Sequence, residues 1–283
     1  MTMRNALKTS YDVLASFLHQ PRLSLRLLER LPYTLRGFEY GQRWKLSHDD
    51  QSLTFSNVGT VSNSSNPLRS HFDSHQVGRG IWKWIHYFDI YHHYFSRFVG
   101  REVNVLEIGV FSGGSLGMWR EYFGPKCHVY GVDIEESCKL YEDNSTKIFI
   151  GDQADRGFWK RLKKKAPIID IVIDDGGHQP VQQIVTLEEM LPHLRSGGIY
   201  LCEDVHGEHN QFSYYVQGLI AQLNSSVVTS FDRENGTVCS TTPFQTAIYS
   251  IHSYPFVTVI ERNDKAVEQF IAPKHGSEWQ PFL

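Results

Sequence analysis

Two short stretches of this chain gather side chains that could perform acid–base or metal chemistry. In "IVIDDGGHQP", an aliphatic run leads directly into Asp174, Asp175 and His178. In "LCEDVHG", another apolar run leads into Glu203 and Asp204. A plain turn needs one Asp or one Gly, and it does not need two aspartates together with a histidine. The two stretches therefore predict a functional site rather than simple chain reversals.

A second group of polar residues follows three apolar runs earlier in the chain. The stretch "EIGVFSGGS" contains Glu107 and Gly109, and its small residues would let a ligand approach backbone N–H groups at the start of a helix. Asp133 follows roughly twenty positions later, the spacing at which a carboxylate holds a ribose diol. Asp152 ends the next apolar run. One acidic strand end could be a helix cap, but three in series favour an adenosine-containing cofactor.

The elements that would position these residues alternate regularly from residue 103 onward. Strands are expected at 103–110, 128–134, 147–153, 169–175 and 196–204, helices at 113–123, 155–165, 180–194 and 212–224, and a closing hairpin at 244–254 and 256–263. Strands that alternate with helices imply right-handed βαβ units and an α/β fold with a mostly parallel, doubly wound sheet. Ligands of such sheets bind outside the carboxyl ends of the strands.

Three carboxylates are expected to converge at that edge of the sheet. If the strands before Asp175 and Glu203 are neighbours, these two side chains and Asp204 would repel one another unless a cation joined them. Carboxylate oxygens suit Mg²⁺ best. A helix N-terminus favours a neutral imidazole, so His178 could act as a base. In the alternative interpretation, Asp174 or Asp175 caps a helix and the Glu203–Asp204 pair is a solvated loop.

The N-terminal quarter of the chain differs from the rest. Residues 1–75 are predicted to form a helical and loop extension, and residues 76–283 the main domain. An aromatic-rich segment at 78–98 has the spacing of a packed helix. Most of its rings are expected in the core, although three of them are candidates to close over the site, namely Trp82, Tyr87 and Tyr91.

The composition excludes several classes of function. The net charge of −3 gives no whole-chain argument for binding nucleic acid or an anionic membrane. The four cysteines have no CxxC spacing, so a zinc site or a disulfide framework is not expected. No continuous apolar segment suggests a signal peptide or a transmembrane helix. We expect a cytoplasmic protein that forms a homo-oligomer.

The glycine-rich turn fits the pattern E-x-G-x-x-x-G. Over about residues 100–262, the chain resembles the class I S-adenosylmethionine-dependent methyltransferases, whose fold also ends in a reversed strand. The resemblance implies a seven-stranded Rossmann-like methyltransferase fold. It also implies S-adenosyl-L-methionine as cofactor, bound by Glu107, Gly109, Ser115, Asp133, Asp152, Gln153 and Asp174.

The combination of "DDGGH" with a later "CEDVH" is more specific than the fold. It is similar to the Mg²⁺-dependent sugar O-methyltransferases of macrolide and related natural-product pathways. The resemblance implies that Asp175, Glu203 and Asp204 bind Mg²⁺, and that His178 is the catalytic base. The acceptor would be a sugar hydroxyl of a small glycosylated natural product or a glycan. A one-residue slip would exchange Asp174 and Asp175. A cephalosporin hydroxylase-like enzyme or a non-catalytic cofactor-binding module on the same scaffold is the alternative.

Overall fold

A computed structural model describes residues 31–36, 39, 66–207, 210–225, 227–232 and 236–278. The chain divides into two compact units, residues 1–62 and 63–283. In the first unit, residues 31–36 are helical, and most of the predicted extension lies outside the described residues. The predicted boundary at residue 75 stays a prediction. Helix α4 (Pro67–Ser74), which precedes it, lies in the second unit, where the Asn66 side chain donates to the Phe88 carbonyl at 2.9 Å.

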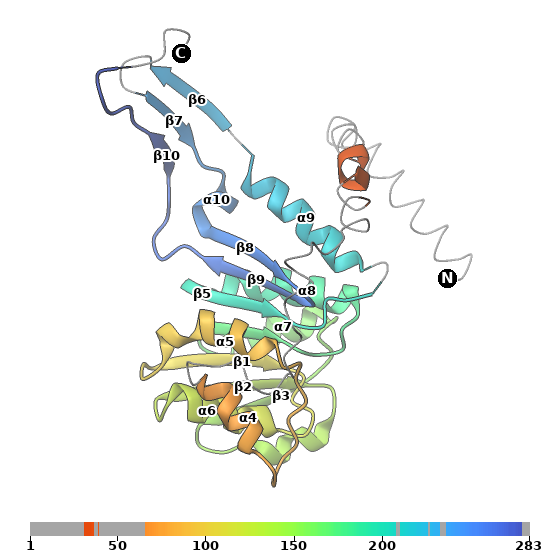
Figure 1. The fold of residues 1–283 in the computed structure, drawn as a ribbon. Helices are drawn as coiled ribbons and strands as arrows, with labels where there is room; N and C mark the ends of the chain where they lie inside the picture. The colour runs from red at the N-terminus through yellow and green to blue at the C-terminus, as the bar shows by residue number, and fades with distance from the viewer. Residues whose placement is uncertain are drawn as a thin grey trace, which may run out of the picture. The chain divides into compact units, whose positions relative to one another are not determined.

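A seven-stranded sheet forms the centre of the second unit (Figure 1). Its order is β3-β2-β1-β4-β5-β9-β8, and β9 runs antiparallel to both of its neighbours. The strands are β1 (Val103–Ile108), β2 (Cys127–Asp133), β3 (Thr146–Ile150), β4 (Ile169–Asp174), β5 (Leu194–Cys202), β8 (Ile248–Tyr254) and β9 (Val257–Arg262). The predicted doubly wound, mostly parallel sheet with a reversed strand is therefore confirmed.

Helices cover both faces of this sheet, as the two hydrophobic clusters show. One cluster contains residues of α4, α5 (Tyr87–Phe95) and α6 (Gly114–Phe123), and the other contains residues of α7 (Arg156–Leu162), α8 (Pro180–Met190) and α9 (Gln211–Leu223). Consecutive strand residues contribute to opposite clusters because side chains alternate across a strand. Short 3₁₀ turns lie at η1 (Ser96–Phe98), η2 (Glu136–Tyr141) and η3 (Leu191–His193).

Two predicted elements begin later than expected. The aromatic helix starts at Tyr87, so the residues from 78 to 86 are not helical. The strand predicted from residue 244 begins as helix α10 (Pro243–Ala247), because Pro243 occupies the first helical turn and Thr242 and Gln245 form a capping box. A second sheet, of three strands, was not predicted. Its order is β10-β7-β6, formed by Gln269–Ala272, Gly236–Ser240 and Val227–Asp232.

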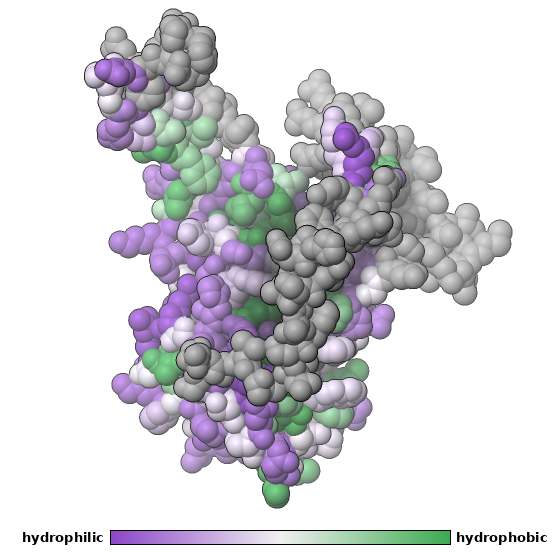
Figure 2. Space-filling view, viewed as in Figure 1, coloured by the Kyte–Doolittle hydropathy of each residue, from purple (hydrophilic) through white to green (hydrophobic). Residues whose placement is uncertain are grey.

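The surface of the described residues is mixed in character. Hydrophilic residues cover much of the described part of the face in Figure 2, with hydrophobic residues interspersed. Within the described ranges, no helix combines the length and the apolar character needed to cross a membrane.

The ends of β1 and β4 touch at Gly109. This residue has φ +88°, and a Cβ atom there would lie 2.0 Å from the Asp175 carbonyl oxygen. The same two loops are joined by a hydrogen bond from the Asp175 amide to the Ile108 carbonyl at 3.0 Å. Glycine is required here both by the left-handed backbone and by the close approach of a neighbouring chain segment.

A buried polar network lies beneath the loop that follows β4. The Asp174 carboxylate accepts hydrogen bonds from Gln153 Nε2 and from the Tyr200 hydroxyl, both at 3.0 Å. The Gln153 Oε1 atom accepts the Gly177 amide at 2.7 Å. Burial raises the pKa of Asp174 to about 6, although the two hydrogen bonds oppose that shift. The network fixes the loop that carries Asp175 and His178.

We predict that Gly109→Ala destabilises the domain by about 2–4 kcal/mol, since it combines overpacking against backbone with a strained φ. Gly117→Ala is the matched control. Gly117 lies in α6, and a Cβ atom there would meet no neighbouring atom within 4 Å, so alanine should stabilise the helix by up to about 1 kcal/mol. Urea denaturation of both variants measures the difference. Equal stability of the two variants would contradict the close contact.

We predict a pH-dependent contribution from Asp174. Its pKa of about 6 in the folded protein exceeds 3.8, the ordinary value, so its protonation stabilises the folded state. That stabilisation is complete below pH 3.8 and is lost as the pH rises through about 6. Relative to Asp174→Asn, the free energy of unfolding of the wild type should fall by on the order of 2–3 kcal/mol between about pH 4 and 7. Urea titrations at each pH test this, and a constant difference would refute it.

Candidate active site

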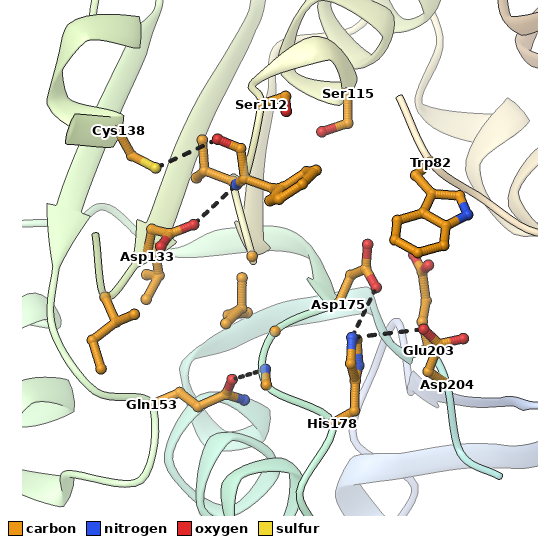
Figure 3. Close-up of a pocket in the computed structure, with 18 of the residues that line it drawn as sticks. Trp82, Ser112, Ser115, Asp133, Cys138, Gln153, Asp175, His178, Glu203 and Asp204 are labelled. Carbon is orange, nitrogen blue, oxygen red and sulfur yellow. Dashed lines mark hydrogen bonds and ion pairs between the residues drawn. The ribbon is translucent and has the colours of Figure 1, made fainter. Parts of the chain in front are cut away.

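One cavity of about 980 Å³ opens at the carboxyl ends of the parallel strands. Its walls come from the loops that follow β1 to β5 and from residues 80–87, which precede and begin α5. The loops after β1, β2 and β3 form what we call the cofactor half. At the other end lie three acidic side chains, the rim carboxylates, which are Asp175, Glu203 and Asp204 (Figure 3). The sequence predicted that both groups lie at this edge of the sheet.

Asp133 organises the cofactor half. Its two carboxylate oxygens accept the backbone amides of Phe111 and Glu135, each at 2.9 Å. A carboxylate oxygen can accept more than one hydrogen bond, so both oxygens retain capacity toward the cavity. Asp152 also lines the cavity, and one of its oxygens accepts the Ala154 amide at 2.8 Å. These two carboxylates lie where ribose hydroxyls could donate to them.

The start of α6 forms another wall of the cofactor half. Gly113, in a left-handed conformation at φ +75°, caps the helix. A Cβ atom at Gly114 would lie 2.4 Å from the carbonyl oxygens of Arg79 and Gly80, so only glycine allows residues 79–80 to approach. Ser115 lines the cavity in the first turn. The amides of a helix N-terminus attract anionic groups such as the carboxylate of an amino acid.

Glu107 and Asp174 do not line the cavity. Both are buried, at 0% and 1% exposure. Glu107 accepts from Ser115 Oγ at 2.8 Å and from Trp119 Nε1 at 3.0 Å, and burial raises its pKa. The geometry gives no support to direct cofactor contacts by these two carboxylates. Glu107 instead holds Ser115 and Asp174 holds Gln153, which do line the cavity.

His178 lies between two of the rim carboxylates. Its Nε2 atom is 3.6 Å from Asp204 Oδ2 and 4.0 Å from Asp175 Oδ1 (Figure 3). One ligand atom from each of these three residues lies within 4.8 Å of the others, a spacing that a single cation could bridge. His178 and Asp204 have positive φ angles, 54° and 53°, which are uncommon for non-glycine residues and often occur at functional sites.

Glu203 has a different environment. It is 1% exposed and accepts the Tyr91 hydroxyl at 2.6 Å. Lys83 Nζ donates to both of its oxygens, at 3.0 and 3.1 Å. Burial raises the pKa of Glu203 and the neighbouring Asp175 adds to the shift, whereas Lys83 and Tyr91 oppose it. The structure thus brings all three rim carboxylates together but supplies Glu203 with partners inside the protein.

Sequence reasoning missed Lys83 and Trp84. Lys83 Nζ lies 2.5 Å from Asp175 Oδ2, and Trp84 Nε1 donates to Asp204 Oδ1 at 2.9 Å. Tyr87 and Tyr91, assigned mainly to the core, are buried and also donate to rim carboxylates, Tyr87 to Asp204 Oδ1 at 2.7 Å. The sequence signal that could have identified Lys83 is its position between two tryptophans, in a segment otherwise rich in aromatic residues.

Aromatic side chains border the rim carboxylates. Trp82, Trp84 and His206 line the cavity, and we call them the aromatic wall. Trp82 is 87% exposed. Phe256, with φ +65°, packs its ring against Trp84 at 5.5 Å and His206 at 5.2 Å between ring centroids. Residue 209, the other histidine of this loop, lies outside the described residues.

Comparisons with known proteins identify related sequences. No family model matches the chain. The chain is 38% identical over 133 residues to the Streptomyces olivaceus 8-demethyl-8-(2-methoxy-alpha-L-rhamnosyl)-tetracenomycin-C 3'-O-methyltransferase, a match that covers 44% of this chain and 33% of that protein. It is 36% identical over 132 residues to the demethylmacrocin O-methyltransferase of Streptomyces fradiae, with the same coverage. The chain therefore spans about a third of the length of these curated relatives.

A solved structure supports the same relationship. The MycE methyltransferase from the mycinamycin biosynthetic pathway, in complex with Mg, SAH and mycinamycin VI, superposes with a TM-score of 0.56 and 26% identity. The match covers 70% of this chain and 53% of that one. The main domain therefore has the class I methyltransferase fold, and part of the chain is related in sequence to sugar O-methyltransferases of glycosylated natural products.

Proposed function

We propose that this chain is an S-adenosyl-L-methionine-dependent and Mg²⁺-dependent O-methyltransferase that acts on a sugar hydroxyl of a glycosylated natural product. The observation that carries the proposal is the position of His178 among the rim carboxylates. The same cavity is lined by Asp133, a carboxylate suited to bind ribose hydroxyls. The related proteins are named as O-methyltransferases. This favours methyl transfer over the hydroxylase-like alternative and over a non-catalytic module.

Two of the rim carboxylates, Asp175 and Asp204, have a spacing that suits a hard divalent cation. Asp175, Asp204 and His178 offer ligand atoms within 4.8 Å of one another, and two of the three are carboxylates. Mg²⁺ prefers oxygen ligands and usually keeps several waters. We propose Asp175, Glu203 and Asp204 as its ligands. Glu203 would bind the cation while it also accepts hydrogen bonds from Lys83 and Tyr91. When bound, Mg²⁺ would lower the pKa of a hydroxyl that coordinates it.

The cofactor half fits S-adenosyl-L-methionine, which supplies an electrophilic methyl carbon when bound. Asp133 and Asp152 would accept the ribose hydroxyls, and Ser115 with the first amides of α6 would bind the amino acid part. Gly109, which lines the cavity, allows the β1 and β4 loops to meet. Gln153, which lines the cavity, would bind directly, whereas Glu107 and Asp174 would act through Ser115 and Gln153.

His178 would remove the proton of the acceptor. Its imidazole is close to Asp204 and Asp175, which stabilise the imidazolium that forms when the hydroxyl O–H bond breaks. When bound, S-adenosyl-L-methionine would supply the methyl carbon to the acceptor oxygen, and the electron pair of the broken carbon–sulfur bond would stay on sulfur. The products would be a methyl ether and S-adenosylhomocysteine. Holding both substrates in one cavity contributes to the rate through orientation.

The aromatic wall supports a glycosylated acceptor. Its rings border the rim carboxylates, so an acceptor hydroxyl near His178 would place the remaining sugar or the aglycone against Trp82. Binding pockets for small molecules are mostly aromatic or apolar with a few polar groups. A homo-oligomeric state and a cytoplasmic location remain predictions.

We predict that methyl transfer requires both a divalent cation and His178. EDTA should abolish activity and added Mg²⁺ should restore it. His178→Ala should lower kcat by about 10²–10⁴-fold, the range typical of a general base, while the Kd for S-adenosylhomocysteine stays within about threefold. His128→Ala, on the exposed surface of β2, is the control. Mass spectrometry of a glycosylated acceptor measures turnover. Near-normal turnover by His178→Ala would rule out its role as base.

We predict that Trp82 contributes to acceptor binding. Trp82→Ala should raise KM for the glycosylated acceptor by about tenfold, equivalent to about 1.4 kcal/mol. The fold should be unaffected because the ring is 87% exposed. Leu140→Ala is the control, since Leu140 is 81% exposed and does not line the cavity. An unchanged acceptor KM, measured at saturating cofactor, would exclude Trp82 from the acceptor site.

A further inference from the structure

Lys83 is the most buried charged side chain of residues 80–87. Its side chain is 3% exposed, and its ammonium group lies 2.5 Å from Asp175 Oδ2 and 3.0 Å from Glu203 Oε1. It also lies 3.8 Å from Glu107 Oε1. Three carboxylates lie within 3.8 Å of this ammonium group, which pairs with them as a cation. One ammonium group thus contacts two rim carboxylates.

Asp175 also belongs to the group of side chains whose spacing a single cation could bridge, and Glu203 is proposed above as a further metal ligand. The two oxygens of Asp175 face different partners: Oδ1 lies 4.0 Å from His178 Nε2, and Oδ2 lies 2.5 Å from Lys83 Nζ. A cation bound by the rim carboxylates would therefore lie close to a permanent positive charge. Two positive charges that share the same carboxylates repel each other, and the repulsion is strong where solvent is excluded.

Glu203 and Asp204 have other partners that would keep them in place without Lys83, and the backbone of Asp175 is fixed by its amide hydrogen bond to the Ile108 carbonyl. Tyr91 donates to Glu203 at 2.6 Å, and Gln183 Nε2 donates to the Glu203 carbonyl at 3.1 Å. Asp204 is held by Trp84 and Tyr87. Removing the ammonium group should therefore change the charge of the site more than its geometry.

We propose that Lys83 is a positioning residue that acts as an internal counter-ion: it holds Asp175 and Glu203 together in the metal-free protein and weakens the binding of the divalent cation. The proposal rests on the metal site proposed above. It has an unusual consequence, because a residue that only maintained the structure would lower metal affinity when removed. Loss of Lys83 should instead tighten metal binding.

The test is calorimetric titration of the metal-free protein with MgCl₂ alone, in the absence of cofactor and acceptor. Lys83→Met keeps most of the side-chain volume and removes the charge. It should bind Mg²⁺ at least about tenfold more tightly than the wild type, and its melting temperature should rise more on addition of Mg²⁺. Lys83→Arg keeps the charge, so its affinity should stay within about threefold of the wild type.

Lys163→Met is the matched control, because Lys163 also pairs with a carboxylate, Glu189 at 2.7 Å, and does not line the cavity. Its Mg²⁺ affinity should equal that of the wild type. If Lys83→Met fails to fold, Lys83→Gln replaces it with the same expected result, because its amide can still donate to a carboxylate.

Unchanged or weaker Mg²⁺ binding by the variant that lacks the charge would overturn the counter-ion role, even if the wild type binds Mg²⁺ and transfers methyl groups. If neither protein bound Mg²⁺, both the metal site and the role of Lys83 would be wrong. Binding by the variant alone would support the counter-ion role while refuting metal dependence of the wild type.

Discussion

The concentration of negative charge at the carboxyl ends of β1, β4 and β5 is the constraint on which the rest of the site depends. Glu107, Asp175 and Glu203 lie close enough that one ammonium group contacts all of them. Two of these carboxylates are almost completely buried, and burying charge without a partner is costly. Lys83 and the phenol of Tyr91 satisfy the charge from inside the protein. Lys83 reaches these carboxylates from residues 80–86, which border the cavity before α5 begins at Tyr87.

Much of the fold and part of the site follow from local sequence. The parallel part of the sheet was predictable because each of its strands is a short apolar run followed by a helix. The proximity of Asp175 and Asp204 follows because β4 and β5, which precede them, are adjacent. The inward direction of Asp174 was not predictable, since neighbouring residues of a strand end point to opposite sides and a shift of one position reverses the assignment. Lys83 is separated from Asp175 by 92 positions, so no local pattern joins them.

Backbone strain is concentrated around the same cavity. Among the described residues, the non-glycine positions with positive φ are Phe111, His178, Asp204 and Phe256. The first three line the cavity, and Phe256 packs behind the aromatic wall. Such conformations cost on the order of 1–3 kcal/mol each and persist only where surrounding contacts enforce them. For Asp204, these contacts are the hydrogen bonds from Trp84 and Tyr87. The aromatic segment therefore holds the rim in its strained form.

Lys83 also connects the two halves of the cavity. Glu107, on the cofactor side, binds Ser115 and Trp119 of α6, while the ammonium group that faces Glu107 binds Asp175 and Glu203 on the rim. A change in charge at the rim should therefore alter the electrostatic potential at α6, which borders the cofactor half. The effect passes through one side chain and needs no movement of the sheet. Because electrostatic interactions are strong where solvent is excluded, the two halves should be energetically coupled. The positive charge of a bound cation would then act on the same rim carboxylates as Lys83, which is the fixed member of the set.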